Sequence, residues 1–345
     1  MRSKQIVRFC LLSVSLGVVC FIAVAQAPVP RQVLLTSTRS LPTEVKYERG
    51  YYILFHRAHT RTPGPADHSV TVLDNNGAQL FFRNPGFDIP EARMVRVRDA
   101  TITKNGLLVV AGFAWNSLTP GPGAAALLVV YDLSNGQPQR IIRTNPIGCN
   151  KVVADDNANF WCLGLDVEKR DSLKRDYELI YKLSLTGEVL ARFLLRSEFA
   201  VPKTAEPFES SPNGNPQLLL SPSGGVLAWF PNADTLVELD ATGNVTARAR
   251  VLGRLPSREH WRLITVGIVP DGTILGFLPA SAGEPLPGDP PAGVYRLNRT
   301  TGSWELLSTE WADSYPPNRL IGVDGRSGVV WVREENRLVW LPPSN

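Results

Sequence analysis

The stretch LVELDATGNVTARAR, residues 236–250, decides the fold. It holds two β-rich runs, 236–239 and 245–248, joined by the turn Asp240-Ala241-Thr242-Gly243. Two short β-rich runs around a turn that contains Asp and Gly are the sequence form of a β-hairpin. The same pattern returns around turns at residues 73–77, 131–136, 185–187 and 297–302. One hairpin therefore repeats along the chain.

A second series of turns alternates with the first. Its members lie at residues 48–50, 104–106, 155–159, 222–225, 270–272 and 324–325. Each is followed by a β-rich run, such as Tyr51-Tyr52-Ile53-Leu54-Phe55. Together the two series give four strands per repeat at a period of about 50 residues, which is typical of the blades of a β-propeller.

The two ends of the chain complete the count of strands. The last repeat supplies β-rich runs near residues 319–323, 329–333 and 337–341, one fewer than a blade needs, and an unpaired run lies at residues 32–36. Pairing that run as the outermost strand of the last blade would close the ring and cover a sheet edge. We therefore predict an all-β fold, a six-bladed β-propeller of four-stranded antiparallel blades closed by an N-terminal strand. Five or seven blades are the alternatives.

The turns resemble those of a known group of propellers. Asp-x-x-Gly between outer strands and Pro-Asp-Gly between inner strands are similar to the six-bladed propellers of the NHL, TolB-like and gluconolactonase-like groups. The resemblance covers nearly all of the chain after residue 25, and it implies a fold and no activity. In the gluconolactonase-like lactonases, acidic and Asn side chains hold a calcium ion in the channel. No position of this sequence matches that arrangement, so no site residue is carried over.

The first 25 residues have the three-part layout of a secretory signal peptide. They contain three basic residues, an apolar run at 9–24 and the small-residue triplet Ala23-Val24-Ala25. We expect cleavage after Ala25, which leaves residues 26–345 as a single propeller domain, secreted or periplasmic. One alternative is an uncleaved anchor, although the run is shorter than the roughly 20 residues of a spanning helix. The other is a lipoprotein acylated at Cys20.

Charge and cysteine content agree with export. Removal of residues 1–25 takes away three of the 36 Lys and Arg residues, which leaves 33 against 32 Asp and Glu and a net charge of +1. That balance gives no electrostatic case for a nucleic acid or an anionic membrane as partner. Cys149 and Cys162 flank the turn at 155–159, so a hairpin there predicts a disulfide. The alternative is two buried free thiols.

The long connections are predicted to share one face of the propeller. In a four-stranded blade, the second-to-third and blade-to-blade connections lie on one face, which we call the long-loop face. The other connections lie on the tight-turn face. The long segments fall at 56–68, 115–126, 165–177 and 279–293 within blades, and at 83–92, 196–216, 252–262 and 309–318 between blades. Because binding residues concentrate on loops held by a rigid scaffold, we expect ligands on the long-loop face.

Basic side chains mark the mouth of the central channel on that face. Arg93, Arg262 and Arg319 each precede an innermost strand, and their guanidinium groups could together hold a carboxylate or phosphate. Pairing with neighbouring acidic residues is the alternative. Further candidates for ligand contact lie in or beside the long loops; they are Trp115, His260, Trp261 and Trp311.

Three histidines crowd into the first long loop. Histidine and aspartate side chains ligate zinc, and this loop holds His56, His59, Asp67 and His68. Calcium is the alternative divalent metal. The alternative interpretation places these histidines on the surface, because no fourth ligand is evident. We therefore predict no cofactor and keep a metal site as the less favoured hypothesis.

No catalytic motif stands out in the sequence. A Gly-x-Ser-x-Gly nucleophile elbow is absent, and the two cysteines after residue 25 suit a disulfide. We therefore expect a monomeric, non-catalytic binding or scaffold propeller that recognises a peptide, protein or glycan through its long-loop face. The alternative is a metal-dependent, lactonase-like hydrolase or lyase with its site at the channel mouth.

Overall fold

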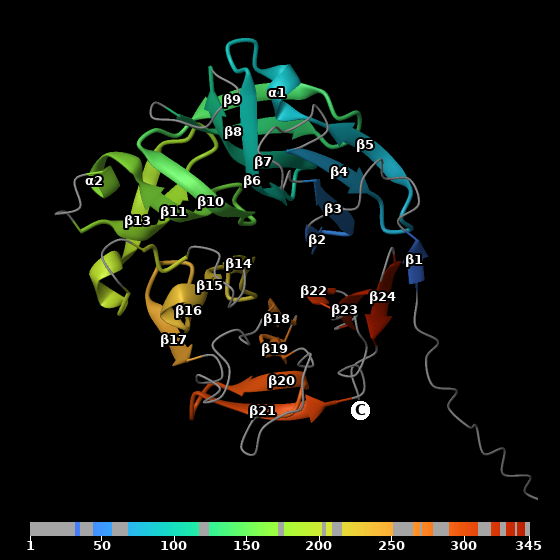
Figure 1. Cartoon of the computed structure of the whole chain (residues 1–345), viewed down its shortest axis with the longest axis vertical. Helices are drawn as coiled ribbons and strands as arrows, with labels where there is room; N and C mark the ends of the chain where they lie inside the picture. The colour runs from blue at the N-terminus through green and yellow to red at the C-terminus, as the bar shows by residue number, and fades with distance from the viewer. Residues whose placement is uncertain are drawn as a thin grey trace, which may run out of the picture.

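The structure is a computed structural model. It describes residues 32–34, 44–56, 68–116, 124–171, 176–201, 205–208, 216–250, 265–269, 271–278, 290–309, 319–324, 329–334 and 337–341. These residues form six four-stranded antiparallel sheets arranged around a centre (Figure 1). The prediction of an all-β propeller with four-stranded antiparallel blades is confirmed.

Five of the sheets are blades made of consecutive strands. Blade 1 is β2 (Glu44–Glu48), β3 (Tyr51–His56), β4 (Ser69–Leu73) and β5 (Gln79–Arg83). Blade 2 is β6 (Met94–Ile102), β7 (Leu107–Trp115), β8 (Ala125–Asp132) and β9 (Pro138–Arg143). Blade 3 is β10 (Ile147–Ala154), β11 (Phe160–Asp166), β12 (Glu178–Leu183) and β13 (Val189–Leu195). Blade 4 is β14 (Gln217–Leu220), β15 (Val226–Phe230), β16 (Thr235–Leu239) and β17 (Val245–Arg250), and blade 5 is β18 (Thr265–Ile268), β19 (Ile274–Leu278), β20 (Gly293–Asn298) and β21 (Ser303–Ser308).

The sixth sheet combines the two ends of the described chain. Its strand order is β1 (Gln32–Leu34), β24 (Arg337–Leu341), β23 (Val329–Glu334) and β22 (Arg319–Asp324). β1 pairs antiparallel with β24, with Gln32 opposite Val339 and Leu34 opposite Arg337. The sequence predicts six blades; the structure has five blades of consecutive strands and this composite sheet.

Helices are short and few among the described residues. They are α1 (Pro85–Asp88), α2 (Val167–Asp171) and the 3₁₀ turns η1 (Arg196–Glu198) and η2 (Pro231–Ala233). All four lie in the connections between strands. None of the described helices is long and apolar enough to cross a membrane.

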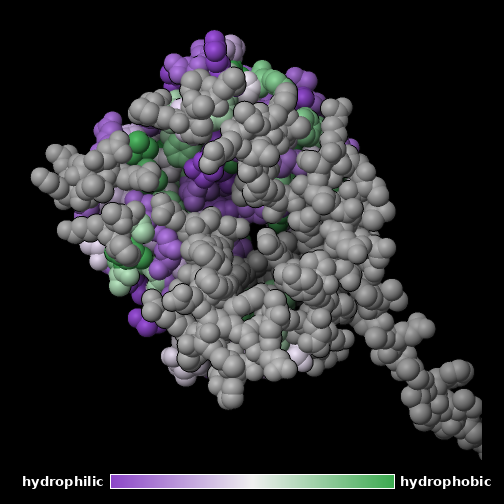
Figure 2. Space-filling model, viewed as in Figure 1, coloured by the Kyte–Doolittle hydropathy of each residue, from purple (hydrophilic) through white to green (hydrophobic). Residues whose placement is uncertain are grey.

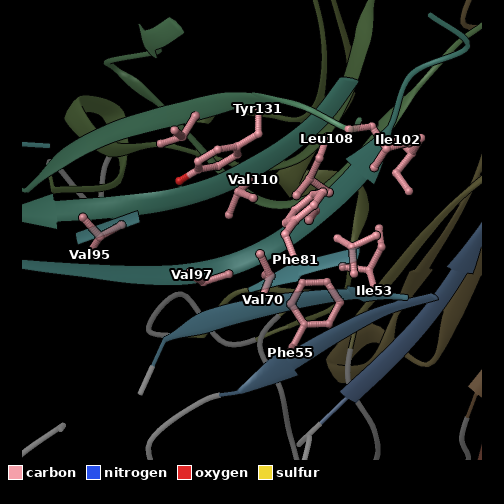
Figure 3. Close-up of a cluster of buried hydrophobic side chains, with 14 of the residues drawn as sticks. Ile53, Phe55, Val70, Phe81, Val95, Val97, Ile102, Leu108, Val110 and Tyr131 are labelled. Atoms are coloured by element: carbon pink, nitrogen blue, oxygen red, sulfur yellow. The ribbon is translucent and has the colours of Figure 1, made fainter. Parts of the chain in front are cut away.

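Successive blades are held together by apolar clusters. Between blades 1 and 2, Ile53 and Phe55 of β3 pack with Val97 of β6 and Val110 of β7 (Figure 3). Successive residues of a strand point to opposite faces of its sheet, so Val109, next to Val110, joins the cluster between blades 2 and 3. Similar clusters lie between blades 3 and 4 and between blades 4 and 5. The second strands of blades 1 to 5 are therefore buried on both faces, which explains their continuous apolar sequences.

Blades 1 to 3 repeat with one fixed offset. Thr101 Oγ donates to Glu48 at 2.6 Å, and the backbone amides of Val152 and Ala154 donate to Asp99 at 2.8 Å and to Thr101 at 2.9 Å. In each of these pairs the partners are 53 residues apart in the sequence. The predicted period of about 50 residues fits this offset.

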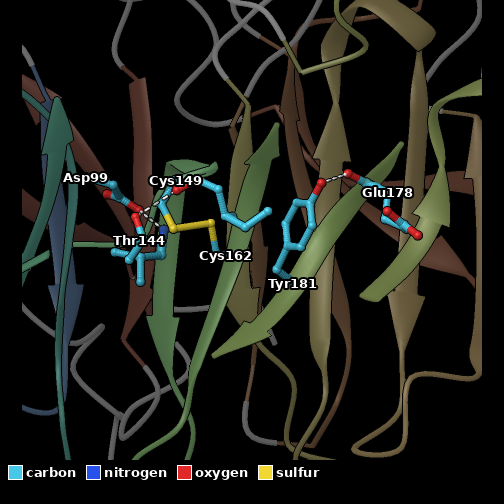
Figure 4. The surroundings of a disulfide bond; sticks show 8 residues. Asp99, Thr144, Cys149, Cys162, Glu178 and Tyr181 are labelled. Atoms are coloured by element: carbon cyan, nitrogen blue, oxygen red, sulfur yellow. Dashed lines mark hydrogen bonds between the residues drawn. A yellow bond between two sulfur atoms is a disulfide. The ribbon is translucent and has the colours of Figure 1, made fainter. Parts of the chain in front are cut away.

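The predicted disulfide is present in blade 3. Cys149 of β10 and Cys162 of β11 are bonded, with their Cα atoms 5.3 Å apart, and both residues are buried. The bond lies across the first hairpin of the blade, between the side chains of Asp99 and Tyr181 (Figure 4). The alternative of two free thiols is wrong for this structure.

Loss of the disulfide should destabilise the protein. For the Cys149→Ser/Cys162→Ser variant we expect a free energy of unfolding lower by about 3 kcal/mol, because closing a loop of this length restricts the unfolded chain by about that amount. Urea unfolding with and without reductant measures the effect. The reductant should lower the stability of the wild type and leave the variant unchanged. Two free thiols in denatured, unreduced wild type would contradict the prediction.

Candidate binding site at the central channel

The inner strands present unpaired edges to the axis. β2, β6, β10, β14, β18 and β22 are the terminal strands of their sheets on the side of the axis (Figure 1). Backbone amides and carbonyls on such an edge need other partners when they are buried. Side chains from neighbouring blades supply them: Lys46 Nζ donates to the carbonyls of Ala100 and Val152, each at 2.9 Å. Gln217 Oε1 accepts from the amide of Val266 at 2.6 Å in the same manner.

Five charged side chains form an axial ion cluster, which we define as Glu44, Lys46, Glu48, Asp99 and Lys151. Lys46 Nζ lies 3.5 Å from carboxylate oxygens of both Asp99 and Glu48. Lys151 Nζ lies 2.8 Å from Glu44 Oε1 and so joins blade 3 to blade 1. The Asp99 side chain is 2% exposed and that of Lys151 is 6% exposed. The cluster therefore bridges three blades in a mostly buried setting.

Burial and charge shift two pKa values in the cluster. Desolvation lowers the pKa of Lys46, but the nearby carboxylates of Asp99, Glu48 and Glu44 outweigh it, so the pKa lies above its usual value. The pKa of Glu48 is raised because desolvation outweighs the attraction of Lys46 and the hydrogen bond from Thr101. Lys46 is thus held as an ammonium ion, whereas burial disfavours ionisation of Glu48.

The raised pKa of Glu48 predicts a pH-dependent effect of Glu48→Gln. A carboxyl whose pKa is higher in the folded state contributes stability at low pH and loses it as pH rises through the folded pKa. The variant keeps an acceptor for Thr101 and cannot ionise. We expect its melting temperature to exceed that of the wild type by about 2 °C at pH 8, and the gap to close as the pH approaches the ordinary value near 4.5. A gap that is constant with pH, measured by thermal unfolding, would contradict this reason.

Two of the predicted binding residues, Arg93 and Trp115, lie at neighbouring strand ends. Arg93 lies just before β6 and Trp115 ends β7, and the backbone amide of Arg93 donates to the Trp115 carbonyl at 2.8 Å. Arg93 is exposed and Trp115 is half-buried. The ring of Phe113 lies 6.2 Å from that of Trp115, and the Arg98 guanidinium lies 5.5 Å over the Phe113 ring. Hydrophilic side chains gather beside the central hollow over the inner strands of blades 2 and 3 (Figure 2).

The structure does not describe the side chains of the other predicted binding residues. Arg319 is the first residue of β22, where the structure describes the backbone. Four more candidates lie outside the described residues; they are Arg262, His260, Trp261 and Trp311. The convergence of Arg262 and Arg319 with Arg93 at the mouth stays a prediction, and so does ligand contact by the other candidates.

Two of the three predicted metal ligands are buried. His56 is 4% exposed, with its Nε2 atom 3.0 Å from Thr71 Oγ, and His68 is 7% exposed. The alternative interpretation of surface histidines is therefore wrong for these two, because both are enclosed in blade 1. His59 lies outside the described residues. Within the described ranges, no three His, Cys, Asp or Glu side chains are grouped as a metal site would need.

Sequence reasoning missed the axial ion cluster. Its signal was the alternation of Glu44, Lys46 and Glu48 along one inner strand, together with Lys151 within the apolar run of β10. Charged residues at alternate positions of a strand lie on one face of its sheet, where they can meet side chains of the next blade. The sequence shows that alternation, and the partners come from other blades.

The fold defines the protein as a β-propeller, and comparisons with known proteins add solved structures of low similarity. No protein-family model matches the chain, and no curated protein sequence matches it. A protein of unknown function from Bacteroides caccae has a TM-score of 0.42 and 11% identity, over 77% of this chain and 81% of its own. Virginiamycin B lyase from Staphylococcus aureus has a TM-score of 0.47 and 10% identity, over 90% of this chain and 98% of its own. The C-terminal WD40 domain of Sif2 has a TM-score of 0.43 and 11% identity, over 87% of this chain and 81% of its own.

Proposed function

We propose that the protein is an exported, non-catalytic binding or scaffold propeller that recognises a peptide, protein or glycan through its long-loop face. The observation that carries the proposal is that exposed Arg93 and half-buried Trp115 are neighbours through their backbones where β6 begins and β7 ends, on the long-loop side of blade 2. Below them the axial ion cluster bridges blades 1 and 3. Aromatic and Arg side chains are the types that contribute most binding energy at protein interfaces.

The chemistry of the channel favours binding over metal-dependent hydrolysis. Calcium takes six to eight oxygen ligands. In the described part of the channel, Lys46 Nζ lies between the carboxylates of Glu48 and Asp99 instead. An ammonium group there supplies the positive charge that a divalent ion would bring. This arrangement supports a protein that acts without a metal cofactor.

The finer architecture and the export of the protein are parts of the same proposal. The composite sheet serves as a sixth blade that closes the ring, which is supported by contacts of β22 with β2 on one side and β18 on the other. Export is supported by the Cys149–Cys162 disulfide, since disulfides persist in oxidising compartments. N-terminal sequencing of the protein from its host tests cleavage after Ala25.

The binding function is tested with a panel of immobilised peptides and glycans. Trp115→Ala should weaken binding of the panel's best ligand at least about tenfold, as expected for truncation of an aromatic anchor. The matched control is Lys104→Ala in a tight turn of blade 2, on the opposite face, where the side chain is 63% exposed. It should leave binding unchanged, and both variants should melt near the wild type. Loss of binding in Lys104→Ala alone, or no binding to any member of the panel, would overturn the proposal.

A further inference from the structure

A pocket of about 620 Å³ lies on the tight-turn face, between blades 4 and 5. It is lined by the turns that follow β14 and β18, and by the end of β20 with the turn that follows it. We call it the tight-turn pocket. Its volume falls within the roughly 300–1,000 Å³ of small-molecule sites in proteins. Because the proposed binding face is the opposite one, a ligand here would occupy a second site.

The buried wall of the pocket is a hydrogen-bonded chain whose donors can be assigned. Glu238, with its side chain 3% exposed, is the carboxylate partner of Arg299 in the next blade, so it only accepts. Ser221 Oγ therefore donates to Glu238 Oε1, at 2.8 Å. In the 2.9 Å contact between the two serine hydroxyls, Ser223 must then donate to Ser221. The hydroxyl oxygen of exposed Ser223 is left as an acceptor at the pocket.

Asp271 supplies a second acceptor on the blade 5 side of the pocket. Its side chain is exposed, and its Oδ1 atom accepts from the amide of Thr273 at 2.8 Å. This bond and one from the Thr273 hydroxyl hold the pKa of Asp271 below its usual value, so the group is a carboxylate at neutral pH. The donors are the guanidinium groups of Arg296 and Arg299, both exposed residues that line the pocket. Acceptors and donors therefore lie side by side.

The charges of the pocket favour a ligand without charge. Among the described lining residues, the carboxylates of Glu238 and Asp271 balance the guanidinium groups of Arg296 and Arg299. An anion would meet the carboxylates and a cation the guanidinium groups, and like charges in contact are costly. A zwitterion would compete with pairs that already exist, since Arg299 is bonded to Glu238 and Arg296 to Glu305 at 2.7 Å. No aromatic side chain lines this part of the described chain as a platform for a flat ring.

We infer that the tight-turn pocket is a second binding site, which takes a neutral saccharide of one or two rings. A hydroxyl group carries one donor and two acceptor positions, so neighbouring sugar hydroxyls can donate to Asp271 and Ser223 while they accept from the arginines. Pro222 and Leu297 add apolar surface for the C–H face of a sugar ring. The ion pair of Glu238 already holds the wall in place, so binding immobilises few side chains.

Isothermal titration calorimetry of the full chain tests the ligand class. The neutral probes are maltose, cellobiose, lactose and N,N′-diacetylchitobiose, and the charged probes are inorganic phosphate, spermidine and the zwitterion alanyl-alanine. At least one disaccharide should bind at one site per chain and more tightly than every charged probe. Binding of none of the disaccharides, or tighter binding of a charged probe, would overturn the saccharide as ligand.

Variants locate the sugar in the pocket. Asp271→Ala should weaken the best disaccharide at least about tenfold, the loss of one hydrogen bond to a charged group. Ser223→Trp should remove binding, because the added ring fills the pocket. The matched control is Asp74→Ala in blade 1, where Asp74 makes the same bonds to the amides of its own turn. It should leave the affinity unchanged, and full binding in Asp271→Ala and Ser223→Trp would overturn the site.

The remaining outcomes separate this second site from the proposed function at the long-loop face. If Trp115→Ala removes binding of the disaccharide and Asp271→Ala keeps it, the sugar binds at the long-loop face and the second site is wrong. If Asp271→Ala removes binding of the disaccharide while Trp115→Ala changes no binding at all, the second site stands and the proposed function fails.

Discussion

Replacement of Lys46 by methionine is expected to lower the free energy of unfolding by about 3 kcal/mol or more, the effect of removing one partner of a buried ion pair. Lys46 donates to two carbonyls on different blades and lies 3.5 Å from Asp99, whose side chain is 2% exposed. Without the ammonium group, the Asp99 carboxylate is left buried without a counter-charge. Its Oδ1 atom has no hydrogen-bond partner among the described residues.

Urea unfolding at pH 7 measures this effect. The matched control is Lys104→Met, because the Lys104 side chain is 63% exposed and its Nζ atom lies 3.9 Å from Asp156 Oδ2. The free energy of unfolding of this variant should differ from that of the wild type by less than about 0.5 kcal/mol. Adding Asp99→Asn to Lys46→Met removes the unpaired charge and keeps an acceptor for the amide of Val152. The double variant should recover much of the loss. A Lys46→Met variant as stable as the wild type would show that the cluster does not stabilise the fold.

The second large effect is expected on the tight-turn face, at the contact between blades 4 and 5. Arg299 pairs through both terminal nitrogens with Glu238, whose side chain is 3% exposed and also accepts from Ser221 Oγ at 2.8 Å. These residues line a hollow of about 620 Å³. Arg299→Ala leaves the Glu238 carboxylate buried and unpaired. We expect a loss of about 3 kcal/mol in the free energy of unfolding.

Arg296 offers a matched control in the same blade. It pairs with Glu305 at 2.7 Å, but both side chains are exposed, at 50% and 42%. Exposed pairs contribute little, so Arg296→Ala should cost less than about 1 kcal/mol. Adding Glu238→Gln to Arg299→Ala should restore most of the lost stability. Equal losses from Arg296→Ala and Arg299→Ala in urea unfolding would contradict the role of burial.

The propeller could be predicted because its turns are determined locally. In the turn that follows β16, Asp240 accepts from the amides of Thr242 and Asn244 at 2.8 and 2.9 Å. These bonds, with that from the Thr242 hydroxyl, lower the pKa of Asp240 to about 2. Asp74 and Asp155 make the same bonds to the amides two and four residues on. A contact within five residues leaves a pattern that the sequence displays directly.

The candidate site could be predicted only in part, because its contacts are long-range. Arg93 and Trp115 lie at strand ends on the long-loop side of one blade, which the hairpin pattern predicts, and their role in binding stays a prediction. Apart from Glu48, the partners of Lys46 are 53 to 106 residues away, and nothing in the sequence pairs them before the register of the blades is known. The β-bulge of β6, where Arg98 is the extra residue, was also missed, because an extra residue in a strand leaves no mark in a β-rich run. The axial ion cluster therefore became visible only in three dimensions.

The fixed offset of 53 residues also has a mechanical consequence. Because Asp99 and Thr101 cap amides of the next blade, and Lys46 and Lys151 reach across to a third, blades 1 to 3 are tied at the axis as one rigid half of the disc. If the disc flexes, this half moves as a block and the bending falls between the blades beyond it. A ligand seated on β6 and β10 would then rest on strands that side-chain hydrogen bonds tie to each other.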